Sequence, residues 1–323
     1  MPYNSVISRT DAAALIPDEV SAEILSNLPQ ASAVMRLARR LPNMSRAQRR
    51  MPVMSALATA YFVDGDTGLK QTSEVQWENV NIDAEELAVI VPIPEAVLDD
   101  ADYDIWAEVR PSIEEALGLA IDQAVLYGTN IPASWTTNLG AAGLVAVCNA
   151  AGHVISAAGY ADLYEAILTE SGAGADGQLM LIEADGFMAT GHIAHVSMRG
   201  MLRGVRDING NPIFSSSMQE AGQYVLDGAP IYFPLNGSIV AGSGLLYSGD
   251  WSKLVYAMRQ DVTYKILDQA VIQDQAGNIV YNLAQQDMVA LRAVMRLGFA
   301  LPNPINRMNA TAATRCPFAV MTA

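Results

Sequence analysis

Apolar residues recur at helical spacing in two segments of the first half of the chain. Between residues 17 and 29 they return every fourth position, after a proline and two acids that suit the first turn of a helix. A longer helix is expected from Asp102 to Tyr127, because its apolar residues follow one another at intervals of three and four. Pro111 lies inside that pattern, which predicts a kink or a late start, and Gly128 should end the helix. The predicted core-facing stripe consists of Trp106, Val109, Ile113, Leu117, Ala120, Ala124 and Tyr127.

A long polar passage, residues 63–80, separates two stretches of strand-forming residues, "ALATAYF" at 56–62 and "NIDAEELAVIVPI" at 81–93. Within residues 73–82, "SEVQWENVNI", apolar and polar residues roughly alternate, as in a strand with one covered face. Gly65 and Gly68, beside Asp64 and Asp66, supply the chemistry of a turn. The pattern predicts a long hairpin. Because an isolated two-stranded hairpin is at best marginally stable in water, something else must cover it.

The rest of the chain has a mixed pattern that ends in strands. Residues 160–171 and 187–205 favour helices, 178–184 a buried strand, and 229–235 and 237–243 short strands. A turn leading into an extended segment is expected at 208–214. In the last third, the alternation at 254–267 and the apolar run at 287–301 predict two long strands, and "QDQAGN" at 273–278 predicts a turn between them.

Composition limits the classes of function. The 323 residues can form one to three domains, and the formal net charge of −15 argues against a general nucleic-acid binder, which must neutralise phosphates. The N-terminal sequence does not resemble a signal peptide, and polar residues interrupt every long apolar stretch, so no membrane span is expected. Cys148 and Cys316 are too few for a disulfide framework, are compatible with a reducing cytosol, and are expected to be small buried apolar residues.

One segment departs from the acidic balance. Residues 36–50, "RLARRLPNMSRAQRR", hold no acidic residue, which predicts a basic arm on an acidic body. Such an arm can dock on acidic neighbours or meet nucleic acid from one face; the alternative is a solvated charged surface. The arm contains Arg36, Arg39, Arg40, Arg46, Arg49 and Arg50.

The search for catalytic or ligand-binding motifs is mostly negative. The sequence has no phosphate-binding loop and no G-x-S-x-G motif. His192 and His195, three residues apart, could share a helical face, but a third metal ligand cannot be placed. Carboxylates in 84–87 and 112–117 are expected to be surface charges. No catalytic, cofactor or metal site is therefore predicted.

The order of these features resembles the tailed-bacteriophage major capsid protein family, with its Hong Kong 97-type fold. Residues 64–100, "DGDTGLKQTSEVQWENVNIDAEELAVIVPIPEAVLDD", resemble the extended loop of that family and its approach to the long helix. "DQAVLYG" at 122–128 resembles the end of that helix. "LLYSGDWSKLVYAMRQDVTYKI" at 245–266 and "DMVALRAVMRLGFALPNP" at 287–304 resemble later strands. The likeness extends from about residue 17 to residue 308.

The resemblance implies an α+β protein whose copies assemble into the icosahedral shell around a double-stranded DNA genome. The open edges of the hairpin would then be covered by the adjacent subunit. The loop tip that would contact this neighbour comprises Asp64, Gly65, Asp66, Gly68 and Lys70. The implied parts are an N-terminal arm at 1–54, an extended loop at 55–91, a peripheral domain at 92–150 with a long spine helix, an axial domain at 151–250, and the remaining peripheral and C-terminal segment at 251–323.

Some members of the family crosslink themselves, joining a loop lysine to an asparagine of a neighbour with a glutamate as base. Lys70 matches the lysine, but the ungapped match places Asp287 at the acceptor and Val294 at the base. An ionised carboxylate is a poor acceptor for the amine, and valine cannot take a proton. The expectation is a shell without covalent crosslinks, with Asn282 or Asn278 as the acceptor if crosslinks do form.

The implied partners are other copies of the chain, in pentamers and hexamers, together with portal and decoration proteins. Because the arm begins almost at Met1, a separate scaffolding protein or none is implied. DNA contact would be weak and nonspecific, with no membrane contact, and the virion capsid would assemble in the host cytoplasm. Two alternatives remain: an encapsulin-like nanocompartment shell enclosing an enzyme, and a metal-dependent or hydrolytic enzyme using His192 or His195.

Overall fold

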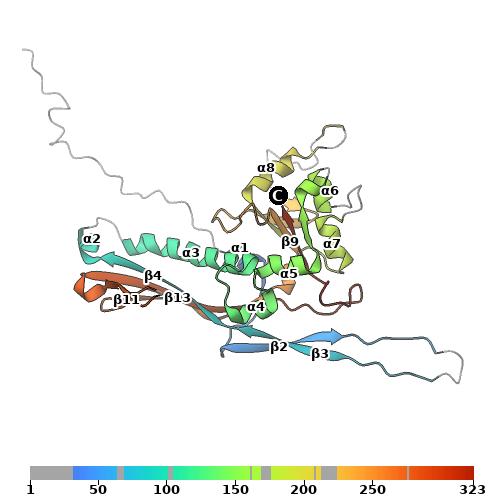
Figure 1. Ribbon diagram of the computed structural model, residues 1–323, viewed down its shortest axis with the longest axis horizontal. Helices are drawn as coiled ribbons and strands as arrows, with labels where there is room; N and C mark the ends of the chain where they lie inside the picture. Colours follow the sequence, from blue (N-terminus) through green and yellow to red (C-terminus); the bar gives the residue numbers. More distant parts are fainter. Residues whose placement is uncertain are drawn as a thin grey trace, which may run out of the picture.

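The computed structural model describes residues 32–63, 69–100, 105–160, 162–168, 176–206, 209–211, 224–274 and 276–323. Helices and strands are both abundant, in agreement with the predicted mixed class. Figure 1 shows a long helix lying along a sheet, a compact group of helices and strands at one end of that helix, and a hairpin that projects away from both.

The long helix α3 (Ile105–Tyr127) covers a four-stranded sheet with the order β1-β10-β13-β4. The bounds of these strands are Arg39–Arg40 for β1, Val255–Leu267 for β10, Met288–Ala300 for β13 and Glu85–Pro94 for β4. Ile113 and Leu117 of the helix share a buried core with Leu291 and Met295 of the sheet. The predicted helix and the two long C-terminal strands are thus confirmed. Helix α2 (Glu95–Asp100) lies between β4 and α3.

Two glycine-dependent features fix the end of α3. Gly128 ends the helix at φ +71°, and a Cβ there would lie 2.3 Å from the carbonyl oxygen of Ala141. Both the positive φ and the close approach require glycine at this position. Pro111 is the seventh residue of α3, beyond the first turn, so the helix continues through a residue that has no amide N–H to donate.

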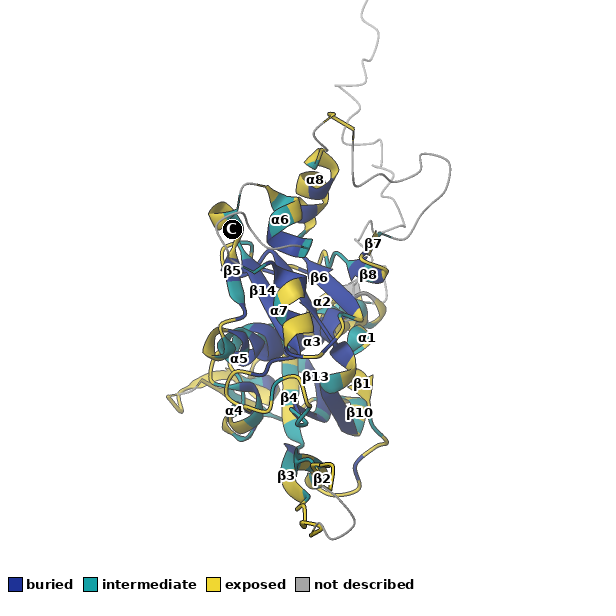
Figure 2. Ribbon diagram, turned by 90° about the vertical axis from the view of Figure 1, so that its right-hand side faces the viewer, coloured by how far each residue is buried: buried dark blue, intermediate teal, exposed yellow. Residues whose placement is uncertain are grey.

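A six-stranded sheet has the order β5-β14-β9-β6-β8-β7 and is buried on both faces. Along β14, Phe318 and Val320 belong to one core, whereas Ala319 and Met321 belong to another. This alternation shows that the sheet is a layer between two sets of helices, and its buried strands form the dark centre of Figure 2. The strands are β5 (Val154–Ser156), β14 (Phe318–Thr322), β9 (Leu246–Gly249), β6 (Gly191–Ala194), β8 (Ala229–Tyr232) and β7 (Val225–Leu226).

Different helices contribute to the two cores. The first core includes α1 (Ala33–Leu37), α3, α4 (Ala133–Leu139) and α5 (Gly143–Ala151), and the second includes α6 (Leu163–Leu168), α7 (Gln178–Ala184) and α8 (Val196–Gly204). The first core also contains residues of both sheets, so the two sheets share one hydrophobic interior. Short 3-10 turns occur at η1 (Ala157–Gly159), η2 (Trp251–Lys253) and η3 (Leu283–Gln285).

Two hairpins stand apart from these sheets. The long one pairs β2 (Gln48–Ala56) with β3 (Gln76–Asp83), from Gln48 opposite Asp83 to Ala56 opposite Gln76. The short one pairs β11 (Val271–Gln273) with β12 (Ile279–Asn282) and contains the predicted turn, where Gly277 has φ +85°. A hairpin is thus present as predicted, although with a different first strand, and the turn predicted at 273–278 is confirmed.

Two predicted elements have the wrong secondary structure. Residues 178–184, expected as a buried strand, form the helix α7 and bury Leu179 and Ile182 on one face. An apolar run of this length fits a buried strand and a buried helix equally well. Residues 237–243, expected as a strand, contain none; Gly237 has φ +73° and a turn brings the amide of Ser243 to the carbonyl of Val240.

Two further predictions had the wrong extent. Residues 187–205 were expected to be one helix but contain the strand β6 before α8; β6 is buried on both faces, so no alternation marks it. Residues 56–62 were expected to be the first hairpin strand, but beyond Ala56 they have no regular structure. The first strand is instead β2, which begins at the end of the arginine-rich segment 36–50 and in which exposed and half-buried residues alternate. Its arginines concealed the strand pattern.

Other predictions are confirmed only in part. Helix α6 lies within the helix expected at 160–171, and β8 within the strand expected at 229–235. The helix expected at 17–29 and the extended segment expected at 212–214 lie outside the described residues.

Candidate assembly surface

The hairpin of β2 and β3 projects from the body (Figure 1). Large apolar side chains on the hairpin are exposed to solvent. Trp77 of β3 is 65% exposed and lies opposite Met54 of β2. Beyond the strands, Leu69 is 89% exposed and Phe62 is fully exposed. Apolar side chains gathered on a projecting element are typical of protein–protein contact surfaces.

Helix α4 fixes the direction in which the hairpin leaves the body. The indole Nε1–H of Trp135 donates to the carbonyl oxygen of Asp83 at 2.9 Å, and Nδ2–H of Asn138 donates to the carbonyl oxygen of Asn81, also at 2.9 Å. Both acceptors lie at the end of β3, just before the chain turns into β4. The helix therefore holds the bend at the base of the hairpin.

Strand β13 passes directly beneath the same bend. Ile82 is fully buried there in a small core. A Cβ at Gly298 would lie 2.5 Å from the carbonyl oxygen of Asp83 and 2.8 Å from Cγ2 of Ile82. Only glycine permits this approach, so the base of the hairpin is packed tightly against the four-stranded sheet.

The outer half of the hairpin is held by hydrogen bonds rather than by a strand ladder. The hydroxyl of Tyr61 donates to the carbonyl oxygen of Gln71 at 2.8 Å, and this bond joins the segment that follows β2 to the segment that precedes β3. Arg307 donates from Nη2 to the carbonyl oxygen of Ala58 at 2.7 Å, so the C-terminal segment also holds the hairpin segment that follows β2. Lys70 is exposed beside the tip. The other predicted tip residues lie outside the described part of the chain: Asp64, Gly65, Asp66 and Gly68.

The predicted basic arm runs from α1 through β1 into β2. Arg49 is half-buried, and the other five arginines are exposed. Arg49 donates to the carbonyl oxygen of Pro42 at 2.9 Å, and the guanidinium of Arg36 lies 4.3 Å from the ring centroid of Tyr232. Among the described residues, none of the six forms an ion pair with a carboxylate. Their charge is therefore available to a partner, whose identity stays a prediction. The six are Arg36, Arg39, Arg40, Arg46, Arg49 and Arg50.

A buried carboxylate anchors the arm to α3. Asp122 accepts hydrogen bonds from the Ser32 hydroxyl and from the amides of Ala33 at 3.0 Å and Val34 at 3.1 Å. Burial raises the pKa of the Asp122 carboxyl above its usual range, although these hydrogen bonds oppose the shift. Sequence reasoning missed this anchor. The available signal was an acidic residue interrupting an apolar helix.

A second buried polar group holds the C-terminal segment. Asp185 Oδ2 lies 3.3 Å from Nε2 of His153 and accepts the amide N–H of Cys316 at 2.6 Å. Nδ1 of His153 lies 3.0 Å from the carbonyl oxygen of Phe318. Arg315 is buried nearby, and burial lowers the pKa of its guanidinium. These groups bond to backbone and to one another, as a structural network does. The sequence contained no signal that would have joined them.

The two candidate metal-binding histidines do not share a helical face, so that prediction is wrong. His192 lies in β6; its Nε2 is 3.2 Å from the carbonyl oxygen of Leu226, and its Nδ1 is 2.8 Å from the hydroxyl of Ser248. Burial lowers the pKa of His192 to about 4. His195 instead caps α8, accepting the amide N–H of Ser197. In the described part of the chain, no group of three or more His, Cys, Asp or Glu side chains could hold a metal ion.

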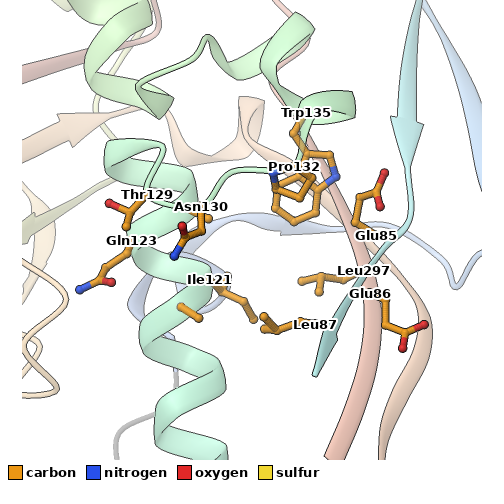
Figure 3. A pocket seen from close by; sticks show the side chains of 12 residues that line it. Glu85, Glu86, Leu87, Ile121, Gln123, Thr129, Asn130, Pro132, Trp135 and Leu297 are labelled. Carbon is orange, nitrogen blue, oxygen red and sulfur yellow. The ribbon is translucent and has the colours of Figure 1, made fainter. Parts of the chain in front are cut away.

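A cavity of about 200 Å³ lies between the end of α3, α4 and β4 (Figure 3). Its apolar wall includes Ile121, Leu87 and Leu297, and the carboxylates of Glu85 and Glu86 point away from that wall. Glu85 accepts from Ser134 at 2.6 Å, and Glu86 pairs with Arg296. Both carboxylates thus have structural partners, and the cavity does not have the arrangement of a catalytic site.

The positions that bear on crosslinking are all described. Val294 is buried in β13, and Asp287 precedes that strand at φ +48°. Asn278 donates to Asp274 at 3.0 Å and Asn282 to Gln285 at 2.8 Å. Because crosslinking joins different subunits, its absence stays a prediction.

Comparison with known proteins gives one consistent result. A model of the phage capsid family matches residues 12–306. The major capsid protein of Staphylococcus phage 80alpha is 26% identical over 284 residues, which cover 87% of this chain and 79% of that protein. A solved structure of Microbacterium phage Oxtober96 has a TM-score of 0.81 and 33% identity, covering 98% of this chain and 99% of that one. A structure of Mycobacterium phage Adephagia has a TM-score of 0.79 and 30% identity, covering 98% of each chain.

The fold is thus that of a structural protein of a virus shell. The chain belongs to the phage capsid family. The predicted function, a major capsid protein that forms the virion shell with other copies of itself, is confirmed, and nothing in these matches favours the nanocompartment alternative. Among the described residues, no helix is long and apolar enough to cross a membrane.

Proposed function

We propose that this chain assembles, as pentamers and hexamers, into an icosahedral shell of the Hong Kong 97 type that encloses the double-stranded DNA genome of a tailed phage. The observation that carries this proposal is the projecting hairpin, with Trp77, Phe62 and Leu69 exposed. A neighbouring subunit that covers these side chains removes their apolar surface from water and so stabilises both copies. A standard interface buries roughly 1,600 Å² in this way. Each shell subunit has several neighbours, so individually weak contacts hold collectively.

The proposed division follows the resemblance found in the sequence. In support, β10 and β13 share a sheet beneath α3, whereas β6, β8 and β9 share another sheet. Strand β14 joins this second sheet, so the C-terminal segment ties the two parts together. Strand β2 lies in both the arm and the loop. The proposed parts are the N-terminal arm 1–54, the extended loop 55–91, the peripheral domain 92–150 with spine helix α3, the axial domain 151–250, and the second peripheral part with the C-terminal segment 251–323.

The proposed shell is held together without covalent crosslinks, and the chain has no catalytic role. Crosslinking requires an amide acceptor and a base near Lys70 of a neighbour. Position 287 is an aspartate and position 294 a buried valine, and neither supplies the required group. Stabilisation then depends on interface area.

The proposed partners follow from this role. They are other copies of the chain, a separate scaffolding protein or none, a portal and decoration proteins, with assembly in the host cytoplasm. The six arginines of the arm have no carboxylate partner among the described residues, which supports docking on acidic neighbours or weak, nonspecific contact with packaged DNA.

Expression of the chain alone tests the proposal. The soluble fraction is separated by sedimentation and viewed by negative-stain microscopy. Closed particles or capsomers support the assignment, and a matched loop deletion from Asp64 to Thr72 should abolish or destabilise them. If the chain stays monomeric alone and when co-expressed with a cognate scaffolding protein, the proposal is wrong.

A further inference from the structure

Cys148 and Cys316 are 168 positions apart in the sequence, yet their Sγ atoms lie 3.8 Å from each other. Cys148 belongs to α5, and Cys316 precedes β14. Both side chains are fully buried. At this separation the sulfur atoms are in van der Waals contact, and a disulfide requires them to approach to about 2 Å.

The backbones that carry the two thiols are held together by one polar network. The amide of Cys316 donates to Asp185 at 2.6 Å, and the same carboxylate oxygen lies 3.3 Å from Nε2 of His153. The amide of His153 in turn donates to the carbonyl oxygen of Cys148 at 2.8 Å. The fold thus keeps the two cysteines adjacent.

We propose that Cys148 and Cys316 form an intramolecular disulfide when the protein meets an oxidising medium. The co-reactant is a low-molecular-weight disulfide. One cysteine thiolate attacks it, forms a mixed disulfide and releases the first small thiolate. The second cysteine thiolate attacks the protein-bound sulfur and releases the other small thiolate. Both protein thiols are oxidised, the small disulfide is reduced to two thiols, and the two cysteine protons pass to these products.

Burial sets the rate of this reaction. It raises the pKa of the Cys148 thiol, so the reactive thiolate forms in locally opened conformations. Cys316 lies at the end of residues 301–317, which contain no helix or strand. We expect this segment to open first and Cys316 to react first. Oxidation should therefore be slow. Once the opened segment has refolded and buried the disulfide, the bond should resist reduction.

The bond would join α5 to the strand that follows Cys316, β14, which lies between β5 and β9. A crosslink between segments so distant in sequence restricts the unfolded chain strongly and stabilises the folded one. The inference goes beyond the proposed assembly, because the bond forms within one subunit. A released virion leaves a reducing cytosol for an oxidising medium, which is where disulfides persist.

The test uses the full chain, incubated with oxidised glutathione in the lowest urea concentration at which iodoacetamide labels both thiols of a reduced sample. After unfolding and alkylation, mass spectrometry of digested protein should identify a peptide pair joined through Cys148 and Cys316, which dithiothreitol separates. The oxidised protein should also unfold at a higher temperature than the reduced one. Two alkylated thiols, or two glutathione adducts without the joined pair, would overturn the proposal.

Two single variants serve as matched controls. Cys148→Ser and Cys316→Ser each leave one thiol, which should form a mixed disulfide with glutathione and show no redox-dependent gain in thermal stability. An equal gain in the wild type and in both variants would assign the effect to something other than this bond.

Discussion

Trp135 donates its indole N–H to the backbone carbonyl of Asp83, and this bond joins a helix of the body to the point where the hairpin leaves it. The same indole packs edge-on against Phe299 of β13, with ring centroids 5.4 Å apart. One side chain thus links the direction of the hairpin to the four-stranded sheet. For a shell subunit, that direction decides where its contacts with the neighbour fall.

Trp135→Phe keeps an aromatic ring but removes the donor to Asp83. We expect a loss of about 1–3 kcal/mol in the free energy of unfolding, from the lost hydrogen bond and part of the packing. The hairpin should become less well oriented, so particle yield should fall by more than the amount of soluble subunit does. Denaturant unfolding and quantitative sedimentation measure the two effects separately.

Trp251→Phe is the matched control. Its indole Nε1–H donates to the carbonyl oxygen of Gly191 at 2.8 Å, within the six-stranded sheet region and away from the hairpin. This variant should lose a similar amount of stability. Its particle yield should fall only in proportion to the amount of soluble subunit. Equal effects of the two variants on assembly would contradict a special role for Trp135.

Trp77→Ala tests the contact surface itself. Because Trp77 is 65% exposed, its removal should change the free energy of unfolding of the free subunit by less than about 0.5 kcal/mol. Particle formation should nevertheless fall sharply, since buried aromatic side chains dominate interfaces. Subunit stability and particle yield are measured on the same preparation.

Gln76→Ala is a neighbouring control, since Gln76 is also exposed but is polar and bonds to Glu74 in its own strand region. We expect its particle yield to stay close to that of the wild type. If Trp77→Ala assembles as well as this control, the apolar face of the hairpin is not an interface.

The absence of covalent crosslinks gives a test on mature particles. Because positions 287 and 294 supply neither an amide nor a base, particles dissolved in hot detergent should give one band near 34.5 kDa. A ladder of larger species that disappears in Lys70→Ala would contradict this prediction. Asn282 and Asn278 would then be the acceptors to examine by the same substitution.

Much of the fold could be predicted from periodic patterns. The stripe along α3, the alternation in β3 and β10, and the turn at Gly277 each reflect local backbone geometry. The failures occurred where periodicity carries no information. Residues 178–184 and 191–194 are short and apolar, and their secondary structure depends on neighbours distant in the sequence.

The candidate surface was predictable only in outline. The polar hairpin could be located from its turn residues, but its first strand was concealed by the charges of Arg49 and Arg50. Neither the bond from Trp135 to Asp83 nor the contact between Cys148 and Cys316 leaves a pattern in the sequence. Such pairs arise from tertiary packing and become visible only in the structure.

His192 predicts a dependence of stability on pH. Its pKa is lowered from 6.5 to about 4 in the folded chain, so between these values the unfolded chain binds more protons. The contribution of neutral His192 to the free energy of unfolding is fully present above about pH 6.5 and is lost as pH falls toward 4. The loss has an upper limit of about 3 kcal/mol. Denaturant unfolding at a series of pH values should show this decline.

The comparison that isolates this effect is His192→Gln, whose amide can still bond to Leu226 and Ser248 but does not titrate. The difference in free energy of unfolding between the wild type and His192→Gln should be independent of pH above pH 6.5 and should change with pH below it. Asp122 acts in the opposite direction, because its raised carboxyl pKa makes the folded chain bind protons more readily and adds stability as pH falls. Asp122 is present in both chains, so its effect cancels in the difference between them. If the free energy of unfolding of the wild type and of His192→Gln depends on pH in the same way, the assignment to His192 is wrong.

The basic arm gives the last prediction, which separates a functional charge from a solvated one. Arg39 and Arg40 are exposed in β1 and have no carboxylate partner among the described residues, so reversing their charge removes no ion pair seen within the subunit. Arg39→Glu with Arg40→Glu should leave subunit stability nearly unchanged but reduce particle yield at low salt, where attraction to acidic neighbours or DNA is strongest. Added salt should reduce the difference between the variant and the wild type. The control, Arg39→Lys with Arg40→Lys, keeps both charges and should retain most of the yield; if the reversed variant matches it at low salt, the arm is a solvated surface and not a contact.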